Sequence, residues 1–135
     1  GGELSHLITS VSGSSNYFLG GICTYQTEKK IEILGVSEEL IQEKTVVSAE
    51  VAQAMSLGCQ KLFKTDVALS TTGVAGPNSD EFNSEIGTVF YSIRVKDFEK
   101  TCRLYLPHLE RKDFMNFVSQ KVLQDLIQIL VKENL

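Results

Sequence analysis

The chain has 135 residues, of which 42% are hydrophobic and 22% charged, and its formal net charge is −4. This size and composition are typical of one soluble globular domain. The weakly acidic balance, without a basic run, argues against nucleic acid as a partner, and no apolar stretch approaches the ~20 residues that cross a membrane.

The first part of the chain predicts short elements. Residues 3–10 have helical periodicity. The aromatic and β-branched stretch YFLGGICTYQ, residues 17–26, predicts a strand whose paired glycines indicate a bulge or a close backbone approach. Two short helices follow, TEKKIEILG closed by Gly35 and SEELIQEK capped by Ser37.

Longer elements follow in the rest of the chain. Ser48 is a good N-cap for a helix over 49–63, and DVALSTT predicts a buried strand. IGTVFYSIRV and KTCRLYL predict a hairpin joined by KDFE, and residues 111–133 predict the last helix. Helices at both ends with strands between them indicate a layered α/β domain, and the hairpin makes its sheet mixed rather than purely parallel.

The three cysteines carry no sign of a metal site. Cys23, Cys59 and Cys102 are far apart and odd in number, which fits neither a zinc site nor a disulfide framework. No signal peptide is visible. We therefore expect buried thiols in a cytoplasmic protein.

A glycine-rich loop follows the buried strand. STTGVAGP, residues 70–77, brings backbone N–H groups to the carboxyl end of a strand, where they can hold an oxyanion or a phosphate. Threonine adds a hydroxyl donor. An irregular loop with glycines in tight turns has the same composition, so the loop alone does not identify a site.

Two further stretches contain a candidate reacting pair. GSSN, residues 13–16, offers a serine nucleophile, or simply serines in a loop or helix cap. Lys29 and Lys30 fall in the first turn of a helix, where the positive helix end lowers the pKa of a lysine. A neutral lysine can accept the proton of a serine hydroxyl. The alternative for both lysines is a solvated, charged turn.

Five stretches, taken together and in this order, resemble the CinA C-terminal domain family over essentially the whole chain: GSSNYFLGGICTY, LGVSEEL, VVSAEVAQAM, TTGVAGP and IGTVFYSI. The resemblance implies a single domain over residues 1–135 with a three-layer α/β/α sandwich and a mixed β-sheet. Members carry ESCT just before the paired glycines, whereas this chain opens at Gly1 and Gly2. The resemblance therefore also implies that the first helix and strand of the family's domain are missing.

The family's known activity is deamidation of nicotinamide mononucleotide, and its site residues can be placed by position. The resemblance puts the nucleophilic serine, the tyrosine and the lysine on Ser15, Tyr25 and Lys30. It puts the substrate-binding residues on Thr72, Gly73, Ala75, Gly76 and Arg111. The chain departs from the family at Thr27, where members have asparagine, and at Glu110, where they have aspartate.

The resemblance implies a mechanism without a metal or a cofactor. Ser15 attacks the carboxamide carbon, Lys30 accepts the serine proton with the help of Tyr25, and backbone N–H groups of residues 72–76 stabilise the oxyanion. Arg111 clamps the phosphate or ribose, unless it forms a surface ion pair with a neighbouring carboxylate. The expected partners are a small nucleotide and further copies of the chain, with a dimer plausible.

Two other functions remain open. The chain could be a non-catalytic nucleotide-binding or assembly module, in line with the family's association with competence and DNA-damage responses. It could also hydrolyse another small amide.

Overall fold

The computed structural model describes residues 1–133. Its elements, in chain order, are α1 (Glu3–Thr9), the 3₁₀ turn η1 (Ser14–Asn16), α2 (Thr27–Leu34), α3 (Glu38–Lys44), α4 (Ala49–Phe63), β1 (Val67–Gly73), β2 (Thr88–Val95), β3 (Phe98–Tyr105) and α5 (Arg111–Lys132). Every helix predicted from the sequence is present. None of the helices in this described range combines the length and apolar character that crossing a bilayer requires.

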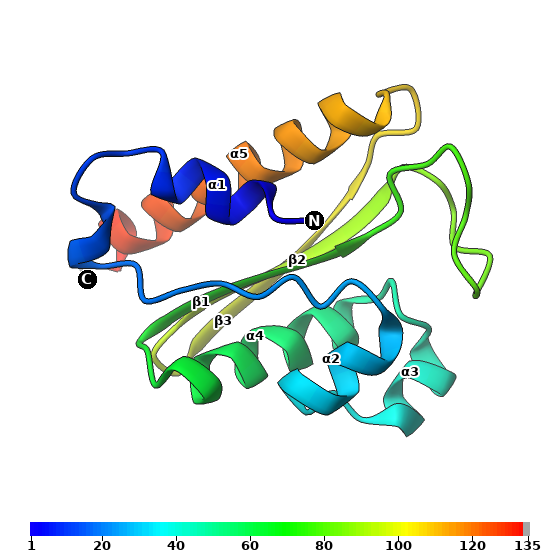
Figure 1. The fold of residues 1–135 in the computed structure, drawn as a ribbon, viewed down its shortest axis with the longest axis horizontal. Helices are drawn as coiled ribbons and strands as arrows, with labels where there is room; N and C mark the ends of the chain where they lie inside the picture. The colour runs from blue at the N-terminus through cyan, green and yellow to red at the C-terminus, as the bar shows by residue number, and fades with distance from the viewer. Residues whose placement is uncertain (134–135) are drawn as a thin grey trace.

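Helices cover both faces of a central sheet (Figure 1). α4 packs along one face, with α2 and α3 on its outer side, and α5 covers the other face with α1 beside it. The predicted layered α/β arrangement is confirmed. Because α2 and α5 lie on opposite sides of the sheet, residues at their first turns can meet only around an edge of the sheet.

The sheet has three strands in the order β1–β2–β3. β1 pairs antiparallel with β2, and β2 pairs antiparallel with β3 through a hairpin whose turn is Lys96 and Asp97. The predicted hairpin is confirmed. The predicted mixed sheet is corrected, because each strand pair within residues 1–133 is antiparallel.

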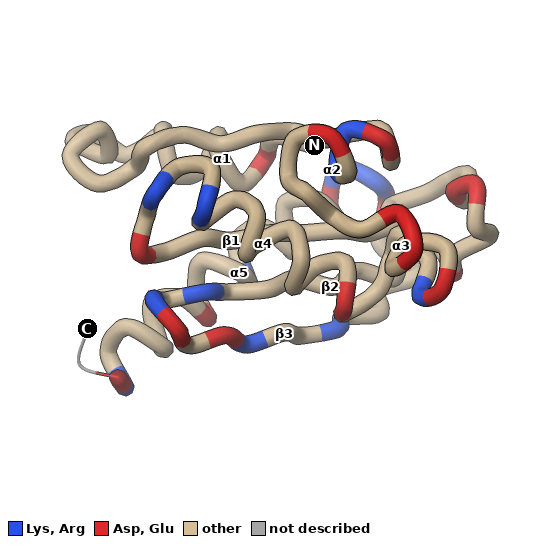
Figure 2. Tube along the Cα trace, turned by 90° about the horizontal axis from the view of Figure 1, so that it is seen from below, with Lys and Arg blue, Asp and Glu red and all other residues tan. Residues whose placement is uncertain are grey.

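One exposed edge of the sheet is β3. Charged side chains of both signs follow one another along it, among them Glu99, Lys100 and Arg103 (Figure 2). Charges on an edge strand oppose edge-to-edge association with another sheet. This edge is therefore protected.

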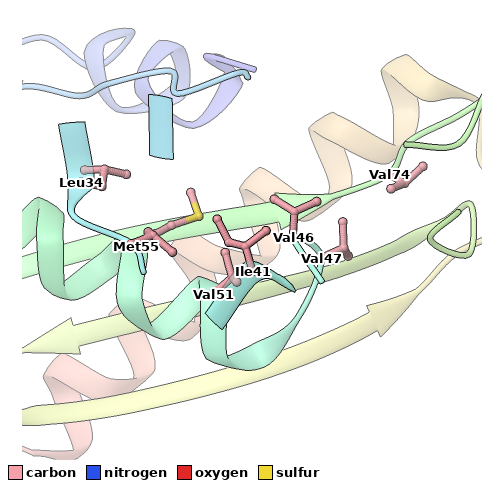
Figure 3. Packing of buried hydrophobic residues seen from close by; sticks show 8 residues of the cluster. Leu34, Ile41, Val46, Val47, Val51, Met55 and Val74 are labelled. Atoms are coloured by element: carbon pink, nitrogen blue, oxygen red, sulfur yellow. The ribbon is translucent and has the colours of Figure 1, made fainter. Parts of the chain in front are cut away.

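Two hydrophobic clusters fill the space between the layers. The first lies between α4, α3 and the end of α2 and contains Ile41, Val51 and Met55 (Figure 3). The second lies between β2 and α5 and contains Ile93 and Val122. Each sheet face therefore has its own apolar layer, which holds the helices that carry the candidate site.

A glycine sets how closely α2 lies against α4. A Cβ added to Gly58 of α4 would stand 1.9 Å from the carbonyl oxygen of Leu34, the last residue of α2. The predicted C-terminal glycine of α2 is confirmed, since Gly35 has a φ of 71°. This close contact fixes the helix that carries Lys30.

Residues 18–25 are extended, but they form no strand. Their backbone makes no backbone–backbone hydrogen bond beyond that of Phe18 to Ser14 within the described part of the chain. The prediction of a strand over residues 17–26 is therefore wrong, because this segment pairs with no other strand of the described chain. The sequence shows which residues favour an extended backbone, whereas a strand also needs a hydrogen-bonded neighbour.

Candidate functional site

Lys30 is the most unusual side chain of the predicted site. It lies in the first turns of α2, only 8% exposed, and its Nζ donates a hydrogen bond to the Thr24 carbonyl oxygen at 2.7 Å. Burial lowers the pKa of Lys30 from its ordinary value of 10.5, while Cys23 and Glu81 act in the opposite direction. A larger neutral fraction makes this amine a better proton acceptor than an ordinary lysine.

Lys29, its neighbour in sequence, is different. Its Nζ pairs with Glu32 at 2.7 Å on the surface, and this contact raises the pKa of Lys29. The two lysines point in different directions because successive helix residues are about 100° apart. The structure thus separates a solvated lysine from a buried one, in line with the choice of Lys30.

Arg111 ties three segments together at one end of the sheet. From the first turn of α5, its Nη1 donates to the Gly76 carbonyl oxygen and its Nη2 to the Tyr25 hydroxyl, both at 2.9 Å. The surface ion pair with Glu110 or Asp113 is not formed. The guanidinium therefore fixes Tyr25 against the glycine-rich loop and keeps further N–H donors for a ligand.

The glycine-rich loop is folded tightly. Gly76 has a φ of 85° and a cis peptide bond to Pro77. The amides of Ala75 and Gly76 have no hydrogen-bond partner among residues 1–133. Two adjacent unpaired N–H groups in such a turn are suited to an oxyanion.

Thr72 has a different role from the one predicted. Its hydroxyl is buried and donates to the Val46 carbonyl oxygen at 2.8 Å. It anchors the end of β1 to the chain before α4, and its single proton is already used. We therefore correct the prediction that Thr72 supplies a hydroxyl donor to the substrate.

The predicted residues line one cavity of about 1450 Å³. It is larger than the usual ~300–1,000 Å³ of a small-molecule site. Residues 18–25 and β1 both contribute to its wall, and seven predicted site residues line it: Tyr25, Lys30, Thr72, Gly73, Ala75, Gly76 and Arg111. The cavity can therefore hold a mononucleotide with room to spare.

Ser15 is not among these lining residues. It is an exposed residue of η1. η1 lies at one end of residues 18–25, and α2 lies at the other (Figure 1). Eight extended residues span about 25 Å. The expectation that Ser15 and Lys30 meet within one chain is therefore corrected.

Two neighbours of Lys30 were missed by the sequence analysis. Glu81, in the loop between β1 and β2, accepts a hydrogen bond from the Thr27 hydroxyl at the start of α2. Nothing in the stretch NSDEFNSE marks which carboxylate returns to α2. Cys23 was predicted to be buried and is exposed, while Cys59 and Cys102 are partly buried. No cluster of three metal-ligating side chains occurs in residues 1–133.

Comparison with known proteins gives the same family from sequence and from structure. The CinA C-terminal domain model matches residues 1–130. A CinA-like protein of Flavobacterium psychrophilum is 54% identical over 93 residues, which are 69% of this chain and 22% of that protein. One of Solibacter usitatus is 40% identical over 124 residues, 91% of this chain and 29% of that protein. The chain thus spans less than a third of these relatives.

Solved structures agree. The crystal structure of a competence-damaged protein (CinA) superfamily protein from Escherichia coli has a TM-score of 0.91 at 25% identity, covering 96% of this chain and 75% of that one. The competence damage-inducible protein A of Klebsiella pneumoniae has a TM-score of 0.92 at 24% identity, with 97% and 81% covered, and shares the fold. The chain belongs to the CinA C-terminal domain family.

Proposed function

We propose that this chain hydrolyses the carboxamide of nicotinamide mononucleotide to nicotinic acid mononucleotide and ammonia. The observation that carries the proposal is the buried amine of Lys30 in a cavity that also contains Tyr25, Arg111 and the unpaired amides of Ala75 and Gly76. The family resemblance supplies the substrate.

The proposed reaction uses these groups in sequence. Neutral Lys30 takes the proton of a serine hydroxyl, and the serine oxygen adds to the carboxamide carbon. The unpaired amides of Ala75 and Gly76 hold the resulting oxyanion, and one such donor is typically worth about 3 kcal/mol. Protonated Lys30 then gives its proton to the departing ammonia. Water, deprotonated by Lys30, cleaves the acyl-serine and regenerates the hydroxyl.

Replacing the two neighbouring lysines tests this proposal. We expect Lys30→Met to lower kcat for ammonia release by about 10²–10⁴-fold, the range for losing a general base. The matched control is Lys29→Met, which removes a solvated charge and should leave kcat near the wild-type value. Circular dichroism checks that both variants fold. Near-normal turnover by folded Lys30→Met would refute the proposed role of Lys30.

One observation favours the alternative of a non-catalytic nucleotide-binding module. The candidate nucleophile Ser15 is exposed in η1 and does not line the cavity that contains Lys30. Calorimetric titration with nicotinamide mononucleotide, run beside the ammonia assay, separates the two functions. Heat of binding without ammonia release supports the module, and ammonia release supports the hydrolase.

We also propose that a further strand fits between residues 18–25 and β1. The extended backbone of residues 18–25 lacks partners, β1 pairs only with β2 in the described chain, and both line the large cavity. A strand there would hydrogen-bond on both sides and would reduce the cavity toward the size of a small ligand. The proposal agrees with the additional strand that the family resemblance implies.

A further inference from the structure

We propose that Glu81 determines which nucleotide the Lys30 site retains: its carboxylate favours a neutral carboxamide beside Lys30 and disfavours the carboxylate of the acid product. The identity of these two ligands rests on the proposed function. The preference itself is a difference between two binding affinities, which is measured without turnover. The site would thus release its acid product readily and keep its affinity for the substrate.

Glu81 lies beside Lys30 at the start of α2. The Thr27 hydroxyl, at the first residue of α2, donates a hydrogen bond to the Glu81 carboxylate, which belongs to the loop at the same end of the sheet (Figure 1). Thr27 and Lys30 are three residues apart and are therefore neighbours on the helix surface. Burial lowers the pKa of Lys30, and Cys23 and Glu81 oppose that shift. Thr27, Lys30 and Glu81 all line the large cavity, so the Glu81 charge acts on whatever lies against the Lys30 amine.

Neighbouring carboxylates are engaged elsewhere. Asp80 accepts hydrogen bonds from two backbone amides and one hydroxyl of its own loop. Glu85 does not line the cavity and acts on a tyrosine of β3, whose pKa it raises. Glu28 is two residues before Lys30 in α2, and side chains two residues apart on a helix do not face each other. Glu81 is therefore the carboxylate of this loop that faces the reacting end of the cavity.

The positive charges of the site would otherwise hold the product. Lys30 and Arg111 are the two basic residues that line the cavity within the described part of the chain. The proposed reaction turns a neutral carboxamide beside Lys30 into a carboxylate, which an ammonium and a guanidinium attract. Slow product release limits the turnover of many enzymes. The Glu81 carboxylate opposes this attraction, because like charges brought together at a binding site lower the affinity.

The hydrogen-bonding groups of Glu81 favour the same ligand. An ionised carboxylate only accepts hydrogen bonds, and it has about four positions at which it can do so. The Thr27 hydroxyl occupies one of them and holds the side chain in place. The remaining positions can accept from the N–H groups of a carboxamide, whereas the carboxylate of the product has no hydrogen to donate. Glu81 would thus recognise the substrate by hydrogen bonding and repel the product by charge.

Binding of two nucleotides that this reaction does not hydrolyse tests the role of Glu81. One is nicotinic acid mononucleotide, the acid product, and the other is 3-acetylpyridine mononucleotide, a neutral ketone of similar shape. Calorimetric titrations are run at mildly acidic pH, on the plateau of the affinity where Lys30 is protonated in every variant. Because Glu81 is exposed, we expect Glu81→Gln to bind the acid about two- to fivefold more tightly, the range for an exposed pair of charges, and to bind the ketone as the wild type does.

Glu85→Gln is the matched control, because it removes the same charge from the same loop outside the cavity, and it should change neither affinity. Unchanged binding of the acid by Glu81→Gln, or an equal change for both nucleotides, overturns the role of Glu81. If the wild-type chain still releases ammonia in that case, the proposed function stands without this role.

The opposite result separates the two proposals in the other direction. A wild-type chain that releases no ammonia, but loses part of its preference for the ketone in Glu81→Gln, refutes the proposed function and supports the role of Glu81. A wild-type chain that binds neither nucleotide overturns both.

Discussion

Lys29 and Lys30 are adjacent in the sequence, but their pKa values are shifted in opposite directions. The surface contact with Glu32 favours the charged form of Lys29, whereas burial disfavours that of Lys30. Because unfolding exposes Lys30 to water, the unfolded chain binds its proton more tightly than the folded one. The contribution of Lys30 to stability therefore rises with pH from its lowered folded-state pKa to about 10.5.

Glu81 should tune the pH dependence of the reaction. Its negative charge holds the pKa of Lys30 up against burial, so Glu81→Gln should lower that pKa further. In the proposed mechanism the neutral amine is the active form, so the part of the kcat/KM profile that rises with pH should move to lower pH. This shift is measured from the pH dependence of kcat/KM for ammonia release. Glu85→Gln, at the other end of the loop between β1 and β2, is the control and should leave the pH profile unchanged.

A second variant separates the charge of Glu81 from its hydrogen bond. Thr27→Val removes the hydroxyl that donates to Glu81 but keeps both the carboxylate and Lys30. If the pH profile of kcat/KM shifts more in Glu81→Gln than in Thr27→Val, the charge of Glu81 causes the shift. Equal shifts would show instead that the tether between the loop and α2 matters.

At the scale of elements, the contact between α2 and α4 depends on one missing side chain. Gly58→Ala favours the helical backbone of α4 by about 1 kcal/mol, yet its Cβ would stand 1.9 Å from the Leu34 carbonyl oxygen. We expect a net loss of about 1–3 kcal/mol, typical of overpacking, together with lower kcat because α2 carries Lys30. Urea unfolding measures the change in the free energy of unfolding. Lys61→Ala, on the exposed side of α4, should change stability little.

The elements also show what the sequence could predict. Ser37 and Ser48 are N-caps that accept hydrogen bonds from Leu40 and Val51, and the hairpin follows from turn residues between two β-rich runs. Those signals are local. The pairing of residues 18–25 is not local, because it depends on a neighbour that no property of the segment identifies.

The same distinction applies to the site. The residues alone left Lys29 and Lys30 equivalent, and the family resemblance assigned both Lys30 and Arg111. Two hydrogen bonds of the site depend instead on how the loops fold in space. The Thr72 hydroxyl donates to the Val46 carbonyl oxygen, and Glu81 accepts a hydrogen bond from the Thr27 hydroxyl. The distance between Ser15 and Lys30 is likewise set by the direction of an extended segment, which the sequence order of the motifs does not reveal.

For the whole molecule, two extended segments at the surface differ in charge. Residues 18–25 contain no Asp, Glu, Lys or Arg, whereas β3 carries charges of both signs. Charges on an edge strand oppose pairing with another strand, so the uncharged segment is the one more open to a strand partner.

The unpaired backbone on the two sides of the large cavity has a consequence for what can stabilise the domain. Residues 18–25 pair with no other strand of the described chain, and β1 pairs only with β2 there. Strand edges with free N–H and C=O groups accept further strands. A short extended peptide that supplied the proposed additional strand would therefore raise the melting temperature of the domain in proportion to the logarithm of its concentration.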